Sequence, residues 1–256
     1  MMRRVRWPHL LVLLFVLLAV FAPQISPHDP ATIHPTILAP PSSAHLFGTD
    51  ALGRDLFSRV LYGGRQTLGV ATVAAAVALA PGLLLGVLWG IAPRPLVPSL
   101  TALFSALLAV PGLLVALVLL AVIGRGMGQI ALAVGLSQIA MVAQVTRGAV
   151  VNVRDAPYIE SAHAIGATPR HIIRRYVLPN IWPVVVAYAG VTFSYSVLNG
   201  AALSFLGLGE LGVPDWGVIL AEGRAVFNAA PWVSIFPGLA ITALVFAVNA
   251  LVDRML

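Results

Sequence analysis

Apolar stretches long enough to cross a membrane recur along this chain, and they constrain its fold more than any other feature. A helix needs about 20 mostly apolar residues to cross the hydrocarbon core of a bilayer. Six stretches approach or exceed this length, which predicts an all-α polytopic membrane protein with six transmembrane helices. The predicted spans are residues 7–25, 66–92, 99–123, 128–146, 181–206 and 233–252.

The composition agrees with a membrane protein and excludes several kinds of chemistry. Only 9% of the residues are charged, against about 25% in a typical soluble domain. There is no cysteine, so disulfides and thiolate chemistry are excluded. All 15 basic residues are arginine, so no lysine is present to form a P-loop. An ATPase that drives this protein must be a separate chain, and we expect no cofactor on this one.

The distribution of arginine predicts the orientation of the spans. Six spans place both termini on one side of the membrane, and arginine is enriched on the cytoplasmic side. If the termini are cytoplasmic, ten of the 15 arginines are too: Arg3, Arg4, Arg6, Arg94, Arg147, Arg154, Arg170, Arg174, Arg175 and Arg254. The five on the other side are Arg54, Arg59, Arg65, Arg125 and Arg224. The net charge of +6 thus follows topology and indicates no nucleic-acid partner.

The first apolar stretch allows two interpretations. A basic start followed by a short apolar run is typical of a cleaved signal peptide, but no small-residue cleavage site follows it. We therefore favour a retained first helix within residues 1–25 and an extracytoplasmic segment over residues 26–65. The three scattered histidines of that segment are expected to be solvated, with no metal site: His28, His34 and His45.

Glycines and tryptophans support two local expectations. Gly82, Gly86 and Gly90 recur every four residues, which predicts one smooth helix face for close packing. Trp216 and Trp232 flank a polar stretch and are expected to anchor the chain at the membrane interface, with substrate contact as the alternative.

Residues 47–65 carry charges of both signs that can pair at the membrane surface. Asp50 and Asp55 can each meet Arg54, Arg59 or Arg65 and so tie the segment together. Exposed pairs of this kind contribute only about 0–1 kcal/mol each. We therefore expect a solvated loop with a short amphipathic helix.

Residues 156–179 form the longest polar interruption between the later apolar stretches. Pro157 can open a short helix, and Gly166 can end it in a left-handed turn. Thr168 is suited to cap a second helix, which Pro179 is expected to stop. The first helix carries small side chains that would let another protein approach closely: Ser161, Ala162 and Ala164.

Four motifs, in order along the chain, resemble those of the permease subunits of ABC importers. Residues 47–65, FGTDALGRDLFSRVLYGGR, are similar to the segment that marks the C-type half of peptide- and nickel-type importers. Residues 201–209, AALSFLGLG, and the Pro-x-Trp-Gly of residues 214–217 match two more patterns. The cytoplasmic EAA…G…LP pattern is matched by Glu160, Ser161, Ala162, Gly166, Leu178 and Pro179. The chain departs from the family at Val97, Ala102, Ser105, Ser161, Tyr176 and Gly200.

The resemblance implies a single permease domain of the type I ABC importer architecture over residues 1–256, with a five-helix core in residues 66–256. It further implies a heterodimer with a homologous permease in a bacterial plasma (inner) membrane. Two cytoplasmic ATPase subunits would hold ATP and magnesium, and an extracytoplasmic binding protein would deliver the cargo. The six matched residues of the cytoplasmic motif would then couple this chain to the ATPases.

The predicted spans contain neutral polar side chains and no charged residue in their interiors. Candidates for the translocation path are Gln138, Gln144, Ser194, Tyr195, Ser196 and Asn199. Each of these side chains could instead hydrogen-bond a neighbouring helix. Secondary transporters usually carry intramembrane carboxylates or histidines as ion relays, so their absence argues against that class. The motifs of zinc peptidases and serine hydrolases are also absent, and no enzymatic activity is expected.

The cargo stays open at the level of sequence. Di- and oligopeptides are the commonest cargo of the family that the chain resembles, and nickel or another small solute is the alternative. A secondary transporter or channel that works alone is a third possibility, which predicts transport without ATP. A membrane scaffold without transport activity would have no reason to carry the cytoplasmic motif.

Overall fold

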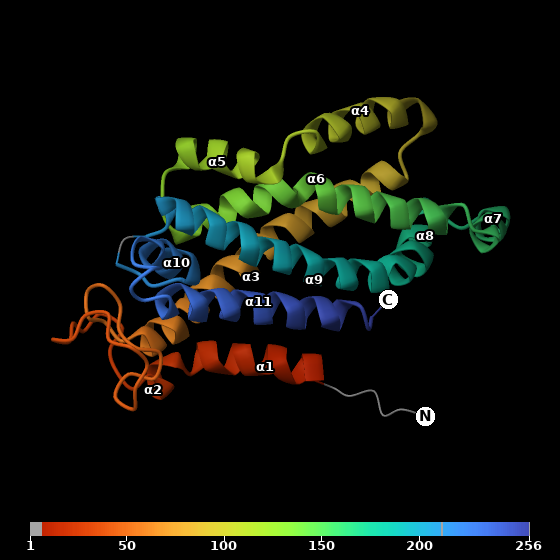
Figure 1. Cartoon of the computed structure of the whole chain (residues 1–256). Helices are drawn as coiled ribbons and strands as arrows, with labels where there is room; N and C mark the ends of the chain where they lie inside the picture. The colour runs from red at the N-terminus through yellow and green to blue at the C-terminus, as the bar shows by residue number, and fades with distance from the viewer. Residues whose placement is uncertain (1–6, 211, 256) are drawn as a thin grey trace.

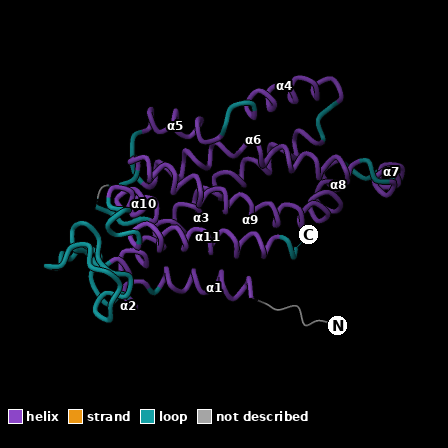
Figure 2. Tube along the Cα trace, viewed as in Figure 1, coloured by secondary structure: helices purple, strands orange, loops and turns teal. Residues whose placement is uncertain are grey.

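The computed structural model describes residues 7–210 and 212–255. Over these residues the chain is helical and contains no strand, apart from two isolated bridges between Ile33 and Arg54 and between Thr49 and Asp55. Long helices run side by side along one axis of an elongated bundle (Figure 1). Loops gather mainly at the end of the bundle near α10 (Trp216–Ala225), whereas α7 (Pro157–Ala164) projects from the opposite end (Figure 2).

Four helices in the described residues are long and apolar enough to cross a membrane alone. They include α3 (Leu56–Gly90), α6 (Met127–Arg154) and α11 (Trp232–Val252). The fourth extends over Pro169–Leu208, with a kink at Gly207 (φ 82°), and its central part is α9 (Leu178–Leu203). At about 1.5 Å per residue, the 35 residues of α3 exceed the thickness of a bilayer core. The second, fourth, fifth and sixth predicted spans are therefore confirmed as helices, with extensions beyond the apolar cores.

The helix α3 begins ten residues before the predicted span. Asp55 caps its N-terminus, because the Asp55 side chain accepts a hydrogen bond from the Ser58 backbone N–H. The predicted short amphipathic helix of the preceding segment is thus the first part of α3. Residues 26–55 remain without a helix of their own and fold over the α10 end of the bundle.

The third predicted span is bent sharply in its middle. After a 3₁₀ turn, η1 (Arg94–Leu96), it forms α4 (Val97–Leu108) and α5 (Gly112–Ile123), which meet at 79°. The third predicted span is therefore a bent pair of helices, because Pro111 lacks an N–H group and holds an extended backbone conformation (φ −54°, ψ 129°).

The first predicted span is also divided. Helix α1 (Trp7–Val20) has 14 residues, and α2 (Ala22–Ile25) follows after Phe21. The α1 helix packs on α11 through stacked Trp7 and Phe246 rings with centroids 5.6 Å apart. The Arg254 guanidinium lies 5.7 Å from the Trp7 ring, so both ends of the described chain lie on one side of the bundle.

The predicted glycine face of α3 is confirmed as the contact with α6. A Cβ atom added at Gly82 would lie 2.6 Å from Val142, and one at Gly86 would lie 2.5 Å from the Ala143 carbonyl oxygen. Such distances are far inside van der Waals contact. The two helix backbones can approach this closely only because these positions lack side chains.

Trp216 lies in the core and not at a membrane interface. It is 2% exposed, and its indole N–H donates to the Val60 carbonyl oxygen at 2.9 Å. Gly63 and Gly64 make room for the ring, since an added Cβ would lie 3.1 and 2.9 Å from it. The interface-anchor expectation for Trp216 is therefore wrong, and the tryptophan instead packs α10 against α3.

We predict that Gly86→Ala destabilises the protein, whereas Gly69→Ala in the same helix does not. The added methyl group at residue 86 would overlap α6, at a cost of about 1–3 kcal/mol. Nothing lies within 4 Å of an added Cβ at Gly69, and alanine favours the helix by about 1 kcal/mol over glycine. Thermal unfolding in one detergent measures the difference. Equal midpoints for the two variants would contradict the proposed contact.

Candidate functional site

The helix α7 offers one face to solvent at its end of the bundle (Figure 1). Ile159 and Ala162 are 2% and 3% exposed and pack inward. On the other face, Tyr158 is 44% exposed, and Glu160 and Ser161 are also exposed. The burial of Ala162 contradicts the expectation that its small side chain lies open to a partner. The accessible surface of α7 thus centres on Tyr158, Glu160 and Ser161.

The turn after α7 has the predicted geometry. Gly166 has a φ of +83°, which is the left-handed region that glycine adopts without strain. The Ala167 N–H donates to the Ala162 carbonyl oxygen at 3.0 Å and closes the helix end. Thr168 then caps α8 (Pro169–Ile172), where its side chain accepts from the His171 N–H at 3.4 Å.

Pro179 does not end the second helix, which corrects the sequence-based expectation. The chain passes from α8 through a π-helical turn, η2 (Ile173–Val177), directly into α9, and Leu178 keeps helical angles (φ −57°, ψ −46°). The wide turn precedes Pro179, which stands in the first turn of α9, where a missing N–H is tolerated. Leu178 and Pro179 are exposed on this helix. A rigid connection therefore joins the α7 turn to a membrane-spanning helix.

Basic side chains line a hollow beside this turn. Its volume is about 590 Å³, and its lining residues are Thr168, Arg170, His171, Arg174 and Arg175. This concentration of positive charge suits a macromolecular partner with acidic groups.

A second region, the bend cavity, lies where α4 and α5 meet opposite α6 and α9. It has a volume of about 410 Å³. Its polar lining is neutral and comes from Ser137, Gln138, Tyr188, Thr192 and Tyr195. The remaining walls are mostly aliphatic, so the cavity can accept a neutral or weakly polar solute without a strong charge.

The structure brings only part of the predicted translocation path into the bend cavity. Gln138 and Tyr195 line it. Ser196 is fully buried and accepts a hydrogen bond from the Gln138 side chain at 2.9 Å, so it positions Gln138. Ser194 is buried and donates to the Asn249 side chain at 3.2 Å.

The other two predicted path residues do not line the bend cavity. The Asn199 amide donates to the Tyr195 carbonyl oxygen at 2.9 Å, and Gln144 is exposed further along α6. Sequence reasoning missed Tyr188 and Thr192, which precede Tyr195 by seven and three residues. Residues at this spacing lie on the same helix face as Tyr195, so a search of that face would have identified both as lining residues.

A buried ion network holds the segment before α3 against α10. Asp50 and Arg59 are 1% and 2% exposed, and Arg59 pairs with both Asp50 and Glu222. Arg54 also contacts Asp50 at 2.7 Å and Glu222 at 3.0 Å. The expectation of weak, solvated pairs is therefore wrong for this group. Removal of one partner from a buried pair typically costs about 3–5 kcal/mol, because the other charge is left uncompensated.

The pKa of the Asp50 carboxyl reflects two opposing influences. Burial acts to raise it, but a hydrogen bond from the Arg54 backbone and the charges of Arg59 and Arg54 lower it below the ordinary value. Asp50 therefore stays ionised within the network and stabilises the fold at neutral pH.

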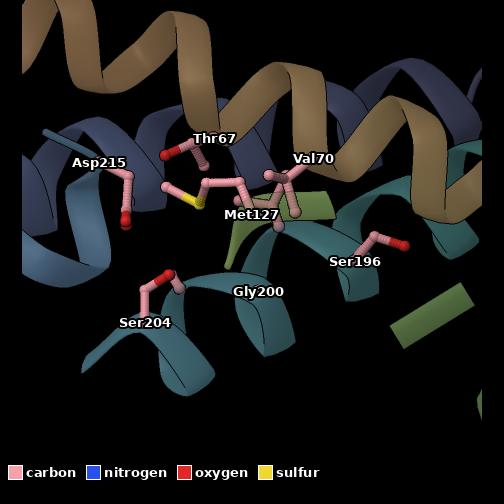
Figure 3. Close-up of a pocket in the computed structure, with 9 residues that line it drawn as sticks. Thr67, Val70, Met127, Ser196, Gly200, Ser204 and Asp215 are labelled. Atoms are coloured by element: carbon pink, nitrogen blue, oxygen red, sulfur yellow. The ribbon is translucent and has the colours of Figure 1, made fainter. Parts of the chain in front are cut away.

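A smaller pocket of about 10 Å³ lies between α3, α9 and the start of α10, with room for about one water molecule. Figure 3 shows Thr67, Ser204 and Asp215 around it, with Met127 and Gly200 in the wall. Asp215 is 2% exposed, and its Oδ1 accepts from the Gly217 N–H at 2.7 Å. Burial raises the pKa of this carboxyl, and the N–H groups of Val218 and Gly217 offset the effect only in part.

These features, a polytopic helical bundle with an exposed helical turn at one end and a neutral cavity within, are those of a membrane protein that can hold a solute. Residues 82–256 match the family described as the binding-protein-dependent transport system inner membrane component. The chain belongs to this family and is a multi-pass membrane protein. The resemblance to ABC importer permeases is confirmed.

Two relatives illustrate the similarity at the level of sequence. The chain is 36% identical over 254 residues to the di/tripeptide transport system permease protein DppC of Pseudomonas aeruginosa, across 96% of this chain and 84% of the relative. It is 36% identical over 249 residues to the glutathione transport system permease protein GsiD of Pectobacterium atrosepticum, across 96% and 83%.

Solved structures support the fold. An inward-facing MetNI methionine ABC transporter chain aligns with a TM-score of 0.63 at 20% identity, across 77% of this chain and 96% of that chain. A chain of an amino acid ABC transporter crystallised with histidines aligns with a TM-score of 0.58 at 17% identity, across 78% and 91%. The type I importer permease architecture expected from the sequence is thus confirmed.

We predict that Asp215→Asn weakens the dependence of stability on pH. Because the pKa of Asp215 is raised in the folded protein, the folded state keeps a proton that the unfolded chain has lost, so stability falls as pH rises above 3.8. Asparagine retains the capping acceptor for Gly217 and Val218 but carries no charge.

Thermal unfolding at pH 3.8, the ordinary pKa of the carboxyl, and at roughly pH 8 tests this expectation. Wild type should lose more stability than Asp215→Asn between the two values. Asp215→Ala, which also removes the helix cap, should lose about 1 kcal/mol at both values. A wild-type protein that gains stability relative to Asp215→Asn as pH rises would refute the assignment.

Proposed function

We propose that this chain is a permease subunit of an ATP-driven importer that carries short peptides. The relatives named above transport di- and tripeptides or glutathione, which is itself a peptide, and they align over most of their length. In this proposal a homologous permease completes the membrane unit, two ATPase subunits bind on the cytoplasmic side, and a binding protein delivers the peptide.

The packing of α7 against three long helices supports its proposed coupling role. Its inner residues, Ile159 and Ala162, pack in the same core cluster as Val87 of α3, Val150 of α6 and Ile181 of α9. The helices α6 and α9 also line the bend cavity. A push on the exposed face of α7 by an ATPase would therefore move the two helices that contact the solute.

The coupling set in this proposal follows the exposure of the side chains. Glu160 and Ser161 contact the ATPase, and Ala162 fixes α7 to the bundle. Gly166 permits the turn, and Leu178 and Pro179 lie on the helix that transmits the movement.

The proposed orientation places α7 and both chain ends in the cytoplasm, with residues 26–55 outside. The arginines of the α7 turn, Arg170, Arg174 and Arg175, support it. Arg3, Arg4 and Arg6, which add to the same argument, lie outside the described residues.

The bend cavity suits transfer of cargo more than tight retention. Its polar groups are neutral, and its walls come from α4, α5, α6 and α9. Gln138 and Tyr195 are the proposed contacts with the peptide backbone, since amides and hydroxyls can donate and accept hydrogen bonds.

We predict that Gly166→Val uncouples ATP hydrolysis from transport. Valine is strained at a φ of +83°, by about 1–2 kcal/mol, so the turn must shift α7. Gly212→Val is the matched control, because Gly212 has a φ of +81° and equally free surroundings at the opposite end of the bundle.

Both variants should insert in the membrane, but only Gly166→Val should lose peptide uptake while the assembled complex still hydrolyses ATP. Uptake into proteoliposomes and phosphate release measure the two activities. Normal uptake by Gly166→Val, or equal loss in both variants, would count against the coupling role.

The importer assignment is tested by co-purification from native membrane in mild detergent, followed by an uptake assay with a radiolabelled dipeptide. We expect a second permease and P-loop ATPases to co-purify, and uptake to require both ATP and the binding protein. Uptake by this chain alone, driven by an ion gradient, would support the secondary-transporter alternative. Saturable uptake of nickel without competition by dipeptide would identify nickel as the cargo in place of peptides.

A further inference from the structure

Three histidines that are far apart in residues 26–55 lie side by side in the folded chain. The ring centroids of His28, His34 and His45 are 5.0, 5.2 and 4.9 Å apart in their three pairings. All three side chains are partly buried, so the expectation of scattered, solvated histidines is wrong. The segment therefore concentrates imidazole groups at one point.

A carboxylate completes this group. Asp55 is fully buried, and its Oδ1 lies 2.9 Å from the His45 Nδ1. Its Oδ2 accepts hydrogen bonds from the Ser58 N–H at 2.8 Å and the Ser58 hydroxyl at 2.7 Å. The carboxylate is thus fixed in place. It contacts the Nδ1 of His45, which leaves the Nε2 of His45 to bind a ligand.

One ring nitrogen of the cluster lacks a protein partner, and the other donor atoms lie close together. The His34 Nε2 is buried and has no hydrogen-bond partner among the described residues. One ligand atom each of His28, His45 and Asp55 lie within 4.8 Å of one another. The His28 Nε2 lies 3.3 Å from the Ala44 carbonyl oxygen, a contact that metal binding through this nitrogen would replace. A buried polar atom without a partner costs about 1–3 kcal/mol, a cost that a bound ion would remove.

We propose that this histidine cluster binds one divalent transition-metal ion of the zinc class. Imidazole nitrogen is a preferred ligand for Zn²⁺, Cu²⁺ and Ni²⁺, whereas Mg²⁺ and Ca²⁺ take oxygen ligands. His28, His34 and His45 supply the nitrogens. Asp55 orients His45 in the carboxylate–histidine–metal arrangement found in many metal sites.

The ion would serve as a structural cross-link of the segment before α3. Residues 26–55 have no helix, and the full sequence has no cysteine with which to form a disulfide. A metal would join His28, His34 and His45 to each other and, through Asp55, to the cap of α3. The cluster shares no residue with the bend cavity, so the ion is a resident of the fold and not the cargo.

The test uses the full-length protein, purified with a tag that contains no histidine and stripped of metal by a chelator. Zn²⁺ is titrated in competition with a chromophoric chelator, and bound zinc is counted by mass spectrometry. We expect one zinc per chain and a higher unfolding midpoint with zinc than without. His34→Ala and His45→Ala should each lower the affinity by more than the roughly 10–100-fold that is typical for loss of an outer-shell partner such as Asp55.

His9→Ala is the matched control, since His9 is exposed on α1 and outside the cluster. It should bind zinc as the wild type does. The metal-free unfolding midpoints of all variants are compared with that of metal-free wild type, so that loss of binding is separated from loss of fold. Asp55→Asn, which keeps the helix cap, provides a second variant with weakened binding.

Two outcomes would overturn the proposal. One is a wild-type protein that binds no zinc or gains no stability from it. The other is unchanged affinity in His34→Ala and His45→Ala, which would place any bound zinc elsewhere. Peptide uptake need not be measured, so failure of this proposal and failure of the importer assignment remain distinguishable.

Discussion

The close contact between α3 and α6 is the constraint on which the rest of the bundle depends. Lipid offers no hydrophobic drive for helices to associate, so they rely on close packing and hydrogen bonds. Gly82, Gly86 and Gly90 let α6 reach the backbone of α3. The pair then positions Gln138 on α6, whose amide donates to Ser196 of α9 and so links a third helix to the bend cavity.

The two ends of the bundle are built from different interactions. At the α10 end, an irregular segment is held by buried charges, in which Asp50 and Arg59 compensate each other. At the α7 end, a short helix rests on an apolar cluster and leaves its polar face exposed. Buried ion pairs resist rearrangement because a separated charge is costly. An exposed amphipathic helix can instead bind a partner and transmit its movement.

The prolines of this chain differ in their effect on the helices that contain them. Pro111 breaks a span by 79°, and Pro81 lies within a continuous α3. Pro179 also continues a helix, because it follows a π-helical turn. Each proline lacks the same N–H group, but of these three only Pro111 interrupts a helix, with an extended backbone conformation (φ −54°, ψ 129°). The presence of a proline in the sequence therefore does not by itself predict where a helix ends.

Features that depend on near neighbours in the chain could be predicted from the sequence. These are the apolar helices, the α7 turn with Gly166 and the Thr168 cap, and the glycine face of α3, because hydropathy, backbone angles and spacing are local properties. Which polar groups meet depends instead on how the folded chain packs. Tyr188 joins Gln138 in the bend cavity, Asp50 and Arg59 become buried, and His28, His34 and His45 converge. Those contacts join residues far apart in sequence, and their burial follows from how the helices and the segment before α3 pack together.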